Sequence, residues 1–319
     1  MPTTRDVANC ANVSTATVSN VLNNTKYVSP EIRDRVMAAA KELQYLSKGT
    51  EAWKKKSEVV FAVYDVCNPH CGMVLDGLNE VAAANSMAVS LMKIWADKEA
   101  FCKMLIEQKV LAVCQYELPE SNLETLRNAG IIIESSWHGL VIDFDSIYDK
   151  AIKHLADLGH RRIVFLRGLS EKDSSNVRLA SFEKAIQRYG LENDPTLIVN
   201  GIYPYETTSQ SGYWATKARL KQKQDFTAVI ALNDLMAIGA MSAIQEKGLS
   251  IPGDISVLGC DDIDLSAFVH PSLSTIRLPA GEIGKRTMYN IIQTMYGEKT
   301  QSVNLELQLI IRNSIGRAS

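Results

Sequence analysis

Apolar residues in the first 45 positions recur every three to four residues in three short blocks, and this spacing predicts three short helices. The first helix is expected at residues 5–11, with Thr4 at its N-cap, and Asn12 tolerates the left-handed turn that follows. Ser29 and Pro30 supply an N-cap and a first-turn proline for the third helix. The apolar side chains expected to face a common core are Val7, Ala8, Ala11, Val18, Val21, Leu22, Ile32, Val36, Ala39, Ala40 and Leu43.

The second helix is expected at residues 15–22, with Ser14 as its N-cap. Its outer face is short, polar and uncharged, so it can approach a DNA major groove closely, donate to phosphates and contact base edges. The residues of this face are Thr15, Ala16, Thr17, Ser19 and Asn20. The pattern therefore indicates a helix-turn-helix, although any small three-helix bundle has similar spacing.

The charge distribution favours DNA as the partner of this segment. Residues 1–56 hold nine Lys and Arg against five Asp and Glu, a net charge of +4. The whole chain carries −2, so the remaining residues carry −6. A basic segment on an acidic body is typical of a nucleic-acid-binding module joined to a second domain, whereas scattered charges would form only a solvated surface.

Short motifs run through the three predicted helices: Thr4, Asp6-Val7-Ala8, Val13-Ser14-Thr15-Ala16-Thr17-Val18-Ser19, Val21-Leu22-Asn23, Val28-Ser29 and Tyr45. This run resembles the DNA-binding head of the LacI family of bacterial transcription repressors. The resemblance implies that bases are contacted by Thr15, Ala16 and Asn20. It implies that the DNA backbone is held by Thr4, Ser14, Thr17, Ser19 and Asn23. Asn20 replaces the arginine commonest in the family, and because Asn pairs with adenine where Arg pairs with guanine, we expect a different half-site.

Residues 46–58 lack periodicity and contain a cluster of lysines, which predicts a linker. The family resemblance implies that this segment forms a short hinge helix on DNA, with a leucine inserted into the minor groove. The chain departs from that pattern, because Ser47 replaces a proline and Gly49 weakens a helix. Trp53 is the candidate for the inserted side chain, with packing on the body as the alternative, and Lys54 is a candidate phosphate contact.

Residues 59–319 alternate strand-like apolar runs with helical stretches, which is the rhythm of βαβ units with parallel sheets. Eight strands are expected, at residues 59–64, 87–91, 110–115, 131–133, 162–166, 196–199, 228–232 and 255–258. Helices are expected between them, for example at residues 73–84, 148–158 and 235–247. The rhythm alone allows either one doubly wound sheet or two lobes with a cleft between them.

Three stretches of the body carry further motifs, at residues 159–163 (GHRRI), 232–240 (LNDLMAIGA) and 254–263 (DISVLGCDDI). They resemble signatures of the type I periplasmic sugar-binding fold that forms the effector domain of the same family. This resemblance implies two lobes joined by three crossovers. The predicted fold is a small all-α helix-turn-helix head followed by a two-lobed, periplasmic-binding-protein-like α/β core with parallel sheets.

Candidate ligand-binding residues follow the predicted strands, because ligands of two-lobed α/β receptors lie at the strand carboxyl ends. The carboxylate of Asp261 can accept two hydroxyl hydrogens of a sugar, and Arg178 offers a fork of donors for ligand oxygens. Both positions match effector residues of the family, and a salt bridge between the lobes is the alternative. The full set of candidate effector residues is Asp65, His70, Trp137, Ser174, Arg178, Tyr203, Asn233 and Asp261.

The loop after the first predicted strand departs from the family, which often has Asn-Pro-Phe-Phe where this chain has Asn68-Pro69-His70-Cys71. The chain therefore lacks the aromatic side chain that could stack on a ligand ring at this position. Cys260 likewise replaces an aromatic residue, and Trp137 is expected to restore an aromatic wall. Cys67, together with the histidine and cysteine of the loop, also suggests a metal site with a fourth ligand such as Cys260. Polar packing of the loop is favoured over that alternative, and no metal or cofactor is expected.

The apolar runs, the cysteine spacing and the motifs of the chain indicate its cellular compartment and whether it is an enzyme. No apolar run reaches the roughly 18 residues of a membrane span, and no signal-peptide pattern is present, so a cytoplasmic protein is expected. The six cysteines lack disulfide-framework spacing, which predicts free thiols. The chain has neither a phosphate-binding glycine-rich loop nor an evident Cys-His nucleophile, so we expect no catalytic residues and no enzyme.

The sequence thus predicts a repressor with a DNA-binding domain at residues 1–45, a linker at 46–58, and an effector-binding and dimerisation domain at 59–319. It is expected to bind a pseudo-palindromic double-stranded DNA operator as a homodimer and to respond allosterically to a small molecule, with a carbohydrate as the leading effector. A purine, a nucleoside or a partner protein is the alternative effector. Two other classes stay open, a cytosolic enzyme that uses the α/β cleft and a ligand-independent architectural DNA binder.

Overall fold

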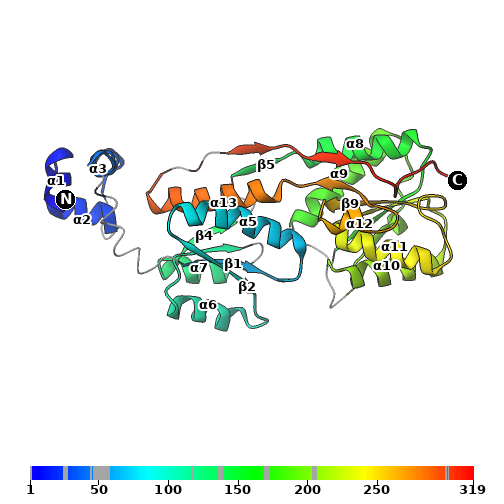
Figure 1. The fold of residues 1–319 in the computed structure, drawn as a ribbon, viewed down its shortest axis with the longest axis horizontal. Coiled ribbons are helices and arrows are strands. Elements are labelled where there is room, and N and C mark those ends of the chain that lie inside the picture. Colours follow the sequence, from blue (N-terminus) through cyan, green and yellow to red (C-terminus); the bar gives the residue numbers. More distant parts are fainter. Residues whose placement is uncertain are drawn as a thin grey trace. The chain divides into compact units, whose positions relative to one another are not determined.

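The chain divides into two compact units in a computed structural model (Figure 1). Residues 1–64, 78–138 and 285–300 form the first unit, and residues 65–77, 139–284 and 301–319 form the second. Each unit contains one main β-sheet with helices, so the predicted two-lobed α/β body is confirmed. The structure describes residues 2–23, 28–43, 45, 58–115, 118–135, 139–168, 173–202, 207–298, 300 and 302–319.

The N-terminal head contains the three predicted helices, α1 (Thr4–Cys10), α2 (Thr15–Asn23) and α3 (Pro30–Glu42). They share an apolar core, with Val13, Val28, Ile32, Met37, Leu43 and Tyr45 packed around it. Asn12 has a φ of 52°, as predicted for the turn before α2. The fully buried members of the core are Val7, Ala8, Ala11, Val18, Val21, Val36, Ala39 and Ala40.

The N-cap of α1 is Thr3, and the prediction of Thr4 was wrong. Thr3 Oγ1 accepts a hydrogen bond from the backbone N–H of Asp6, while the Asp6 carboxylate accepts one from the backbone N–H of Thr3 at 2.6 Å. This capping box requires an acidic residue three positions after the cap, and only Thr3 has that spacing to Asp6. Thr4 is instead the first helical residue, and its Oγ1 lies 2.5 Å from the Tyr45 hydroxyl.

The main sheet of the first unit has four parallel strands in the order β2-β1-β3-β4. β1 is paired on both sides, and its last five residues are buried, as is typical of a central parallel strand. The strands are β1 (Glu58–Val63), β2 (Ala88–Lys93), β3 (Ala112–Gln115) and β4 (Ile132–Ser135). The connecting helices are α5 (Pro69–Ala84), which begins in the second unit, α6 (Lys98–Glu107) and α7 (Glu120–Asn128).

The main sheet of the second unit has six strands in the order β12-β10-β9-β8-β6-β7, and only the β10–β12 pair is antiparallel. Its strands are β6 (Ile163–Arg167), β7 (Ile198–Asn200), β8 (Ala228–Ala231), β9 (Ser256–Asp261), β10 (Ser274–Arg277) and β12 (Gln308–Ile310). Its helices are α8 (Phe144–Asp157), α9 (Asp173–Arg188), the short η1 (Pro195–Leu197), α10 (Ser209–Gln222), α11 (Asp234–Glu246) and α12 (Leu265–Phe268). A separate parallel pair joins β5 (Leu140–Ile142) to β11 (Val303–Leu305), and α13 (Ala280–Met295) begins in this unit.

All eight predicted strands are present, each within three residues of its expected ends. The prediction missed β5, β10, β11 and β12, which are three or four residues long. Segments this short carry little periodic signal, and β12 has exposed or half-buried residues at the edge of its sheet.

Helices α10 and α11 pack at a distance that only glycine permits. A Cβ atom on Gly239 of α11 would lie 1.9 Å from the backbone oxygen of Ser209 in α10. A Cβ atom on Gly212 of α10 would lie 2.1 Å from the backbone oxygen of Met236 in α11. The two glycines therefore set the separation of these helices, which lie side by side in Figure 1.

The C-terminal segment closes the second unit from one side of its sheet. Ser314 Oγ donates to the Val257 backbone oxygen at 2.6 Å and accepts from the Ser274 backbone N–H at 2.8 Å. His160 Nε2 lies 3.0 Å from the Gly316 oxygen, while its Nδ1 lies 2.8 Å from Thr227 Oγ1. Because the carbonyl can only accept, Nε2 carries the proton and Nδ1 accepts from the threonine hydroxyl.

Candidate functional site

The polar face of α2 begins at a capped helix end. Ser14 Oγ accepts a hydrogen bond from the backbone N–H of Thr17 at 3.0 Å, so Ser14 is the N-cap, as predicted. It also lies 2.8 Å from the Thr17 hydroxyl. Thr15, Ala16 and Ser19 are exposed, while Thr17 and Asn20 are half-buried. The helix thus presents small side chains to solvent beside an apolar core, which is the arrangement that major-groove contact needs.

The other predicted DNA contacts divide into two groups. Thr4 is half-buried, and its hydroxyl contacts Tyr45 at the end of the head. The side chain of Asn23, and all of Trp53 and Lys54, lie outside the described residues.

The candidate effector residues of the second unit meet at the carboxyl edge of its main sheet. Asp261 is the last residue of β9, and Arg178 lies on α9, which follows β6. His70 lies in the first turn of α5. All three side chains are buried, with 5%, 7% and 7% exposure for Asp261, Arg178 and His70. The sequence analysis named these three residues as effector candidates from the predicted strand ends together with the family resemblance, and their role as effector contacts stays a prediction.

Arg178 is held by the strand ends and by an aromatic ring. Its Nη1 donates to the Leu232 backbone oxygen at 2.7 Å and lies 3.8 Å from Cys260 Sγ. The guanidinium carbon sits 5.1 Å from the centre of the Phe144 ring, within the range of a cation–π contact. Arg178 and Asp261 belong to the same unit, so the alternative of a salt bridge between lobes is excluded.

Asp261 ends β9 with an unusual backbone, because its φ is 120° and that of Asp262 is 56°. Such values are strained for residues with a side chain, and strain of this kind is often found at ligand sites. Burial raises the pKa of Asp261 to about 7, against the opposing effect of the Arg178 charge. This carboxyl group can therefore either donate or accept a hydrogen bond near neutral pH.

His70 is fixed by the start of α5. Asn68 Oδ1 accepts from the His70 backbone N–H at 3.0 Å, and Pro69 is the first residue of the helix. The His70 Nδ1 atom lies 3.8 Å from Asp261 Oδ1, which is too far for a hydrogen bond. Burial lowers the pKa of His70 to about 4, and the Arg178 charge acts in the same direction. The imidazole is therefore neutral at pH 7, and the contact is not an ion pair.

Asp234 is a central residue that the sequence prediction did not select. It is the first residue of α11 and is fully buried, and its carboxylate accepts three hydrogen bonds. The donors are Thr275 Oγ1 at 2.6 Å, Ser266 Oγ at 2.7 Å and the Ile263 backbone N–H at 3.0 Å. Gly259 leaves room for it, since a Cβ there would lie 2.1 Å from Asp234 Oδ1. Burial raises the pKa of Asp234 to about 6, and the negative charge of Asp261 adds to the rise.

Asp234 therefore fixes the loop that follows Asp261. Its three partners lie on β10, on α12 and in the loop between β9 and α12. The available signal in the sequence was an acidic residue within the otherwise apolar stretch at 232–240. The adjacent Asp262 is tied down as well, because its carboxylate accepts from Arg277 and from Arg312 at 2.6 Å each.

The remaining predicted effector residues have other hydrogen-bond partners or lie outside the described residues. Asn233 is the N-cap of α11, where its Oδ1 accepts from the Met236 N–H and its Nδ2 donates to the Thr207 oxygen, both at 2.9 Å. Asp65 is half-buried and accepts from the Cys67 N–H at 2.9 Å. Trp137, Tyr203 and the side chain of Ser174 lie outside the described residues.

Two of the cysteines near this site, Cys71 and Cys260, are buried. Burial raises the pKa of Cys71 to about 12, with further contributions from Asp261 and Asp65, and burial also raises the pKa of Cys260. Cys67 is exposed. Within the described part of the chain, no three His, Cys, Asp or Glu side chains are grouped so as to hold a metal ion. The alternative of a metal site therefore gains no support from this cluster.

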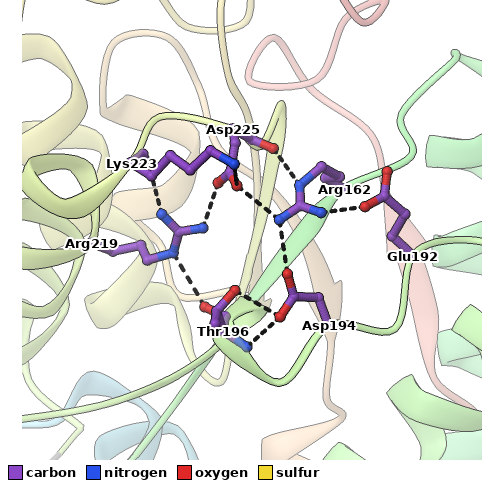
Figure 2. A network of polar contacts seen from close by, with 7 residues as sticks. All are labelled: Arg162, Glu192, Asp194, Thr196, Arg219, Lys223 and Asp225. Carbon is purple, nitrogen blue, oxygen red and sulfur yellow. Dashed lines mark hydrogen bonds and ion pairs between the residues drawn. The ribbon is translucent and has the colours of Figure 1, made fainter.

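The opposite edge of the same sheet carries a network of charged residues, shown in Figure 2. Arg162, which precedes β6, bonds to Glu192, to Asp194 at 3.1 Å and to Asp225 at 2.9 Å. Arg219 also donates to Asp225, at 2.5 Å. Burial alone would raise the pKa of Asp225, but hydrogen bonds from Arg219 and Lys223 outweigh it and lower the pKa to about 2. The Arg162 of the GHRRI motif thus holds the strand beginnings together, away from the strand ends that carry the effector candidates.

None of the helices formed by the described residues has a stretch long and apolar enough to cross a membrane.

Comparison with known proteins assigns both parts of the chain. Residues 3–47 match the family described as bacterial regulatory proteins, lacI family, and residues 152–315 match the periplasmic binding protein-like domain. The HTH-type transcriptional repressor CytR of Escherichia coli strain K12 is 31% identical over 331 residues, covering 98% of this chain and 96% of the repressor.

Two solved structures are similar over nearly the whole chain. A complex of the transcriptional regulator CelR with cellobiose has a TM-score of 0.72 at 25% identity, with 98% of this chain and 100% of that chain covered. The lac repressor dimer bound to operator and the anti-inducer ONPF has a TM-score of 0.69 at 25% identity, with 98% of each chain covered. Head, core and length all agree with the resemblance found in the sequence, and the chain belongs to the lacI family of bacterial regulatory proteins, as a transcription regulator.

Proposed function

We propose that this regulator is a repressor that binds a pseudo-palindromic operator as a homodimer and changes its DNA affinity when a carbohydrate binds at the carboxyl edge of the second unit's sheet. The observation that carries the proposal is the buried group formed by Arg178, Asp261 and His70. A donor fork beside a carboxylate and a neutral imidazole suits a ligand rich in hydroxyl groups. The CelR structure, similar over the whole chain, contains cellobiose.

The operator contacts are assigned to α2 and to the residues before it. Thr15, Ala16 and Asn20 are proposed to contact bases, because they belong to the polar face of α2 and the capped N-terminus of a recognition helix enters the major groove. The DNA backbone is proposed to be held by Thr4, Ser14, Thr17, Ser19 and Asn23, with Trp53 and Lys54 as linker contacts. The domain boundaries are proposed at residues 45 and 58.

Homodimerisation is proposed because a palindromic operator is matched by a two-fold symmetric protein. The lac repressor in the similar structure is a dimer on its operator. On this chain, α12 carries two large apolar side chains that face solvent, Leu265 at 49% and Phe268 at 82% exposure. We assign this α12 surface to the dimer interface, because burial against a second copy would remove apolar area from water.

The effector acts by shifting a population. A sugar alters operator affinity only to the extent that it binds the DNA-competent and DNA-incompetent conformations differently. The protein is proposed to have no catalytic activity, because the thiols of Cys71 and Cys260 are protonated and buried and so cannot serve as nucleophiles. Nucleosides and partner proteins are the competing effectors.

The test is selection from a randomised duplex pool with the full chain, followed by fluorescence-anisotropy titration of the selected site at a fixed salt concentration. Each titration is repeated with cellobiose, D-ribose, D-glucose, cytidine and adenosine. Enrichment of an inverted repeat whose affinity changes with a sugar supports the proposal. Binding without sequence preference contradicts the repressor function. A response to cytidine or adenosine alone would identify the effector as a nucleoside and contradict a carbohydrate effector. Consumption of any of these compounds would favour an enzyme.

A further inference from the structure

We propose that one hydroxyl group of the effector bridges His70 Nδ1 and Asp261 Oδ1, and that His70 thereby determines which hydroxylated ligand this regulator accepts. This inference rests on the proposed function and gives a specific role to the residue that occupies the place of a stacking aromatic. It is carried by the geometry of the pair and by the hydrogen-bonding state of His70.

The distance between His70 Nδ1 and Asp261 Oδ1 suits one bridging oxygen atom. At 3.8 Å they are too far apart for a direct hydrogen bond, yet one oxygen atom placed between them reaches both at ordinary hydrogen-bond lengths of roughly 2.8 Å. The His70 side chain is only 9% exposed, and its Nδ1 has no hydrogen-bond partner within the described part of the protein. A buried polar nitrogen without a partner costs stability, so a ligand that supplies the partner gains affinity.

A hydroxyl group satisfies this pair better than other ligand groups. It donates its hydrogen to the Asp261 carboxylate and accepts from an Nδ1–H, or it donates to Nδ1 and accepts from a protonated Asp261. A ligand carboxylate would be repelled by an ionised Asp261, and an ammonium group would be placed near the positive charge of Arg178. The pair thus selects neutral, hydroxylated ligands.

Neighbouring residues extend the polar surroundings. Tyr148 on α8 is fully buried, and its hydroxyl likewise has no hydrogen-bond partner within the described residues. Burial raises the pKa of this hydroxyl, and the positive charge of Arg178 acts in the opposite direction. His70 and Tyr148 therefore offer two buried polar atoms that have no hydrogen-bond partner among the described residues.

The experiment combines His70 variants with ligands that lack single hydroxyl groups. Isothermal titration of the full chain with cellobiose, D-ribose and D-glucose identifies a sugar that binds, and its monodeoxy analogues are then titrated into wild type, His70→Phe and His70→Asn. Removal of the bridging hydroxyl is expected to weaken binding to wild type by roughly 5–10-fold, the value of one or two neutral hydrogen bonds. In His70→Phe this penalty is expected to fall at least ~3-fold, whereas His70→Asn, which keeps a polar atom near the Nδ1 position, retains most of it. His154→Phe, the same change at a half-buried histidine of α8, is the matched control and keeps the wild-type penalty.

Operator affinity without sugar and the melting temperature show whether each variant is folded. A second measurement needs no variant, because the ¹⁵N shift of His70 Nδ1 in histidine-labelled wild type should move to a hydrogen-bonded value at sugar saturation. The inference is overturned if removing the hydroxyl group weakens binding equally in wild type and His70→Phe, or if the Nδ1 shift does not change at sugar saturation. Either result leaves the proposed function, a repressor that responds to a sugar, unaffected. If none of the three sugars binds, this inference falls together with the carbohydrate effector, and operator binding in the same samples decides the DNA-binding function separately.

Discussion

Replacing Gly239 by alanine should separate α10 from α11 and destabilise the second unit. The added Cβ would meet the Ser209 backbone oxygen at 1.9 Å and the Tyr213 backbone nitrogen at 2.7 Å, whereas ordinary contact begins near 3.4 Å. Both obstacles are backbone atoms of α10, so no side-chain rotation relieves them. The helices must therefore move apart by roughly 1.5 Å, taken as the shortfall from ordinary carbon contact.

The energetic consequence has two opposing parts. Overpacking of this kind costs about 1–3 kcal/mol, while alanine is a better helix former than glycine by about 1 kcal/mol. Separation of the helices also loosens buried residues at the contact, such as Met236, Ala240 and Ala215. Because both clashes are with backbone atoms, the upper end of the overpacking range applies, and about 3 kcal/mol less about 1 kcal/mol leaves a net loss of about 2 kcal/mol. Such a loss lowers the melting temperature by roughly 4–8 °C for a unit of this size.

The assay is thermal and urea unfolding followed by circular dichroism, with Gly281→Ala as the control. Gly281 lies in the first turn of α13, and a Cβ there would meet no atom within 4 Å. The same chemical change should therefore leave stability unchanged or raise it by up to about 1 kcal/mol. If Gly239→Ala is as stable as wild type, the argument that these helices touch through glycine is refuted.

Three further predictions follow from other residues. Asp234→Asn removes a carboxyl whose pKa is raised to about 6 from 3.8, so the stabilisation that its protonation gives wild type is fully present below about pH 4 and is lost as the pH rises to about 6. The difference in unfolding free energy between wild type and this variant should change by about 3 kcal/mol over that interval, and a constant difference in urea titrations would contradict the assignment. Phe268→Asp should weaken dimerisation by at least about 30-fold in sedimentation velocity, because burial of an aromatic side chain is worth about 2–3 kcal/mol, and an unchanged dimer would place the interface elsewhere. Asn20→Arg should shift one position of each selected half-site from adenine to guanine, and recovery of the wild-type site from the same randomised pool would exclude Asn20 from base contact.

Local sequence signals predicted the elements that are long and strongly patterned. The head helices and eight strands of the body followed from apolar spacing and capping residues, because each carries its own periodic signal. The N-cap of α1 was misplaced by one residue, since Thr3 and Thr4 both suit a cap and only the reach to Asp6 decides between them. The short strands β10 and β12 owe their existence to pairing with β9 and with each other, a tertiary effect that local sequence does not contain.

The sequence analysis named the residues of the candidate effector site but not the residue that supports them, Asp234. Arg178 and Asp261 could be grouped because the parallel strands β6 and β9 end at one edge of the same sheet, and both positions match the family resemblance. The approach of His70, which follows β1 of the other sheet, is a tertiary contact. The role of Asp234 depends on donors as distant along the chain as Ser266 and Thr275, which only the fold brings together. Burial, which sets the pKa of each carboxyl group here, is likewise a property of the assembled unit.

Contacts made by residues 308–316 determine when the second unit can finish folding during synthesis. The network of Arg162 with Asp225 closes within residues 162–225 and can form as soon as those residues emerge. The sheet of the same unit still lacks its edge strand β12, the Ser314 bonds to Val257 and Ser274, and the Gly316 partner of His160 until the last part of the chain has been synthesised. Because nascent chains fold from the N-terminus onward, the head can be complete while the effector unit is still unfinished. A nascent chain can thus hold a finished DNA-binding head before the unit proposed to control it has closed.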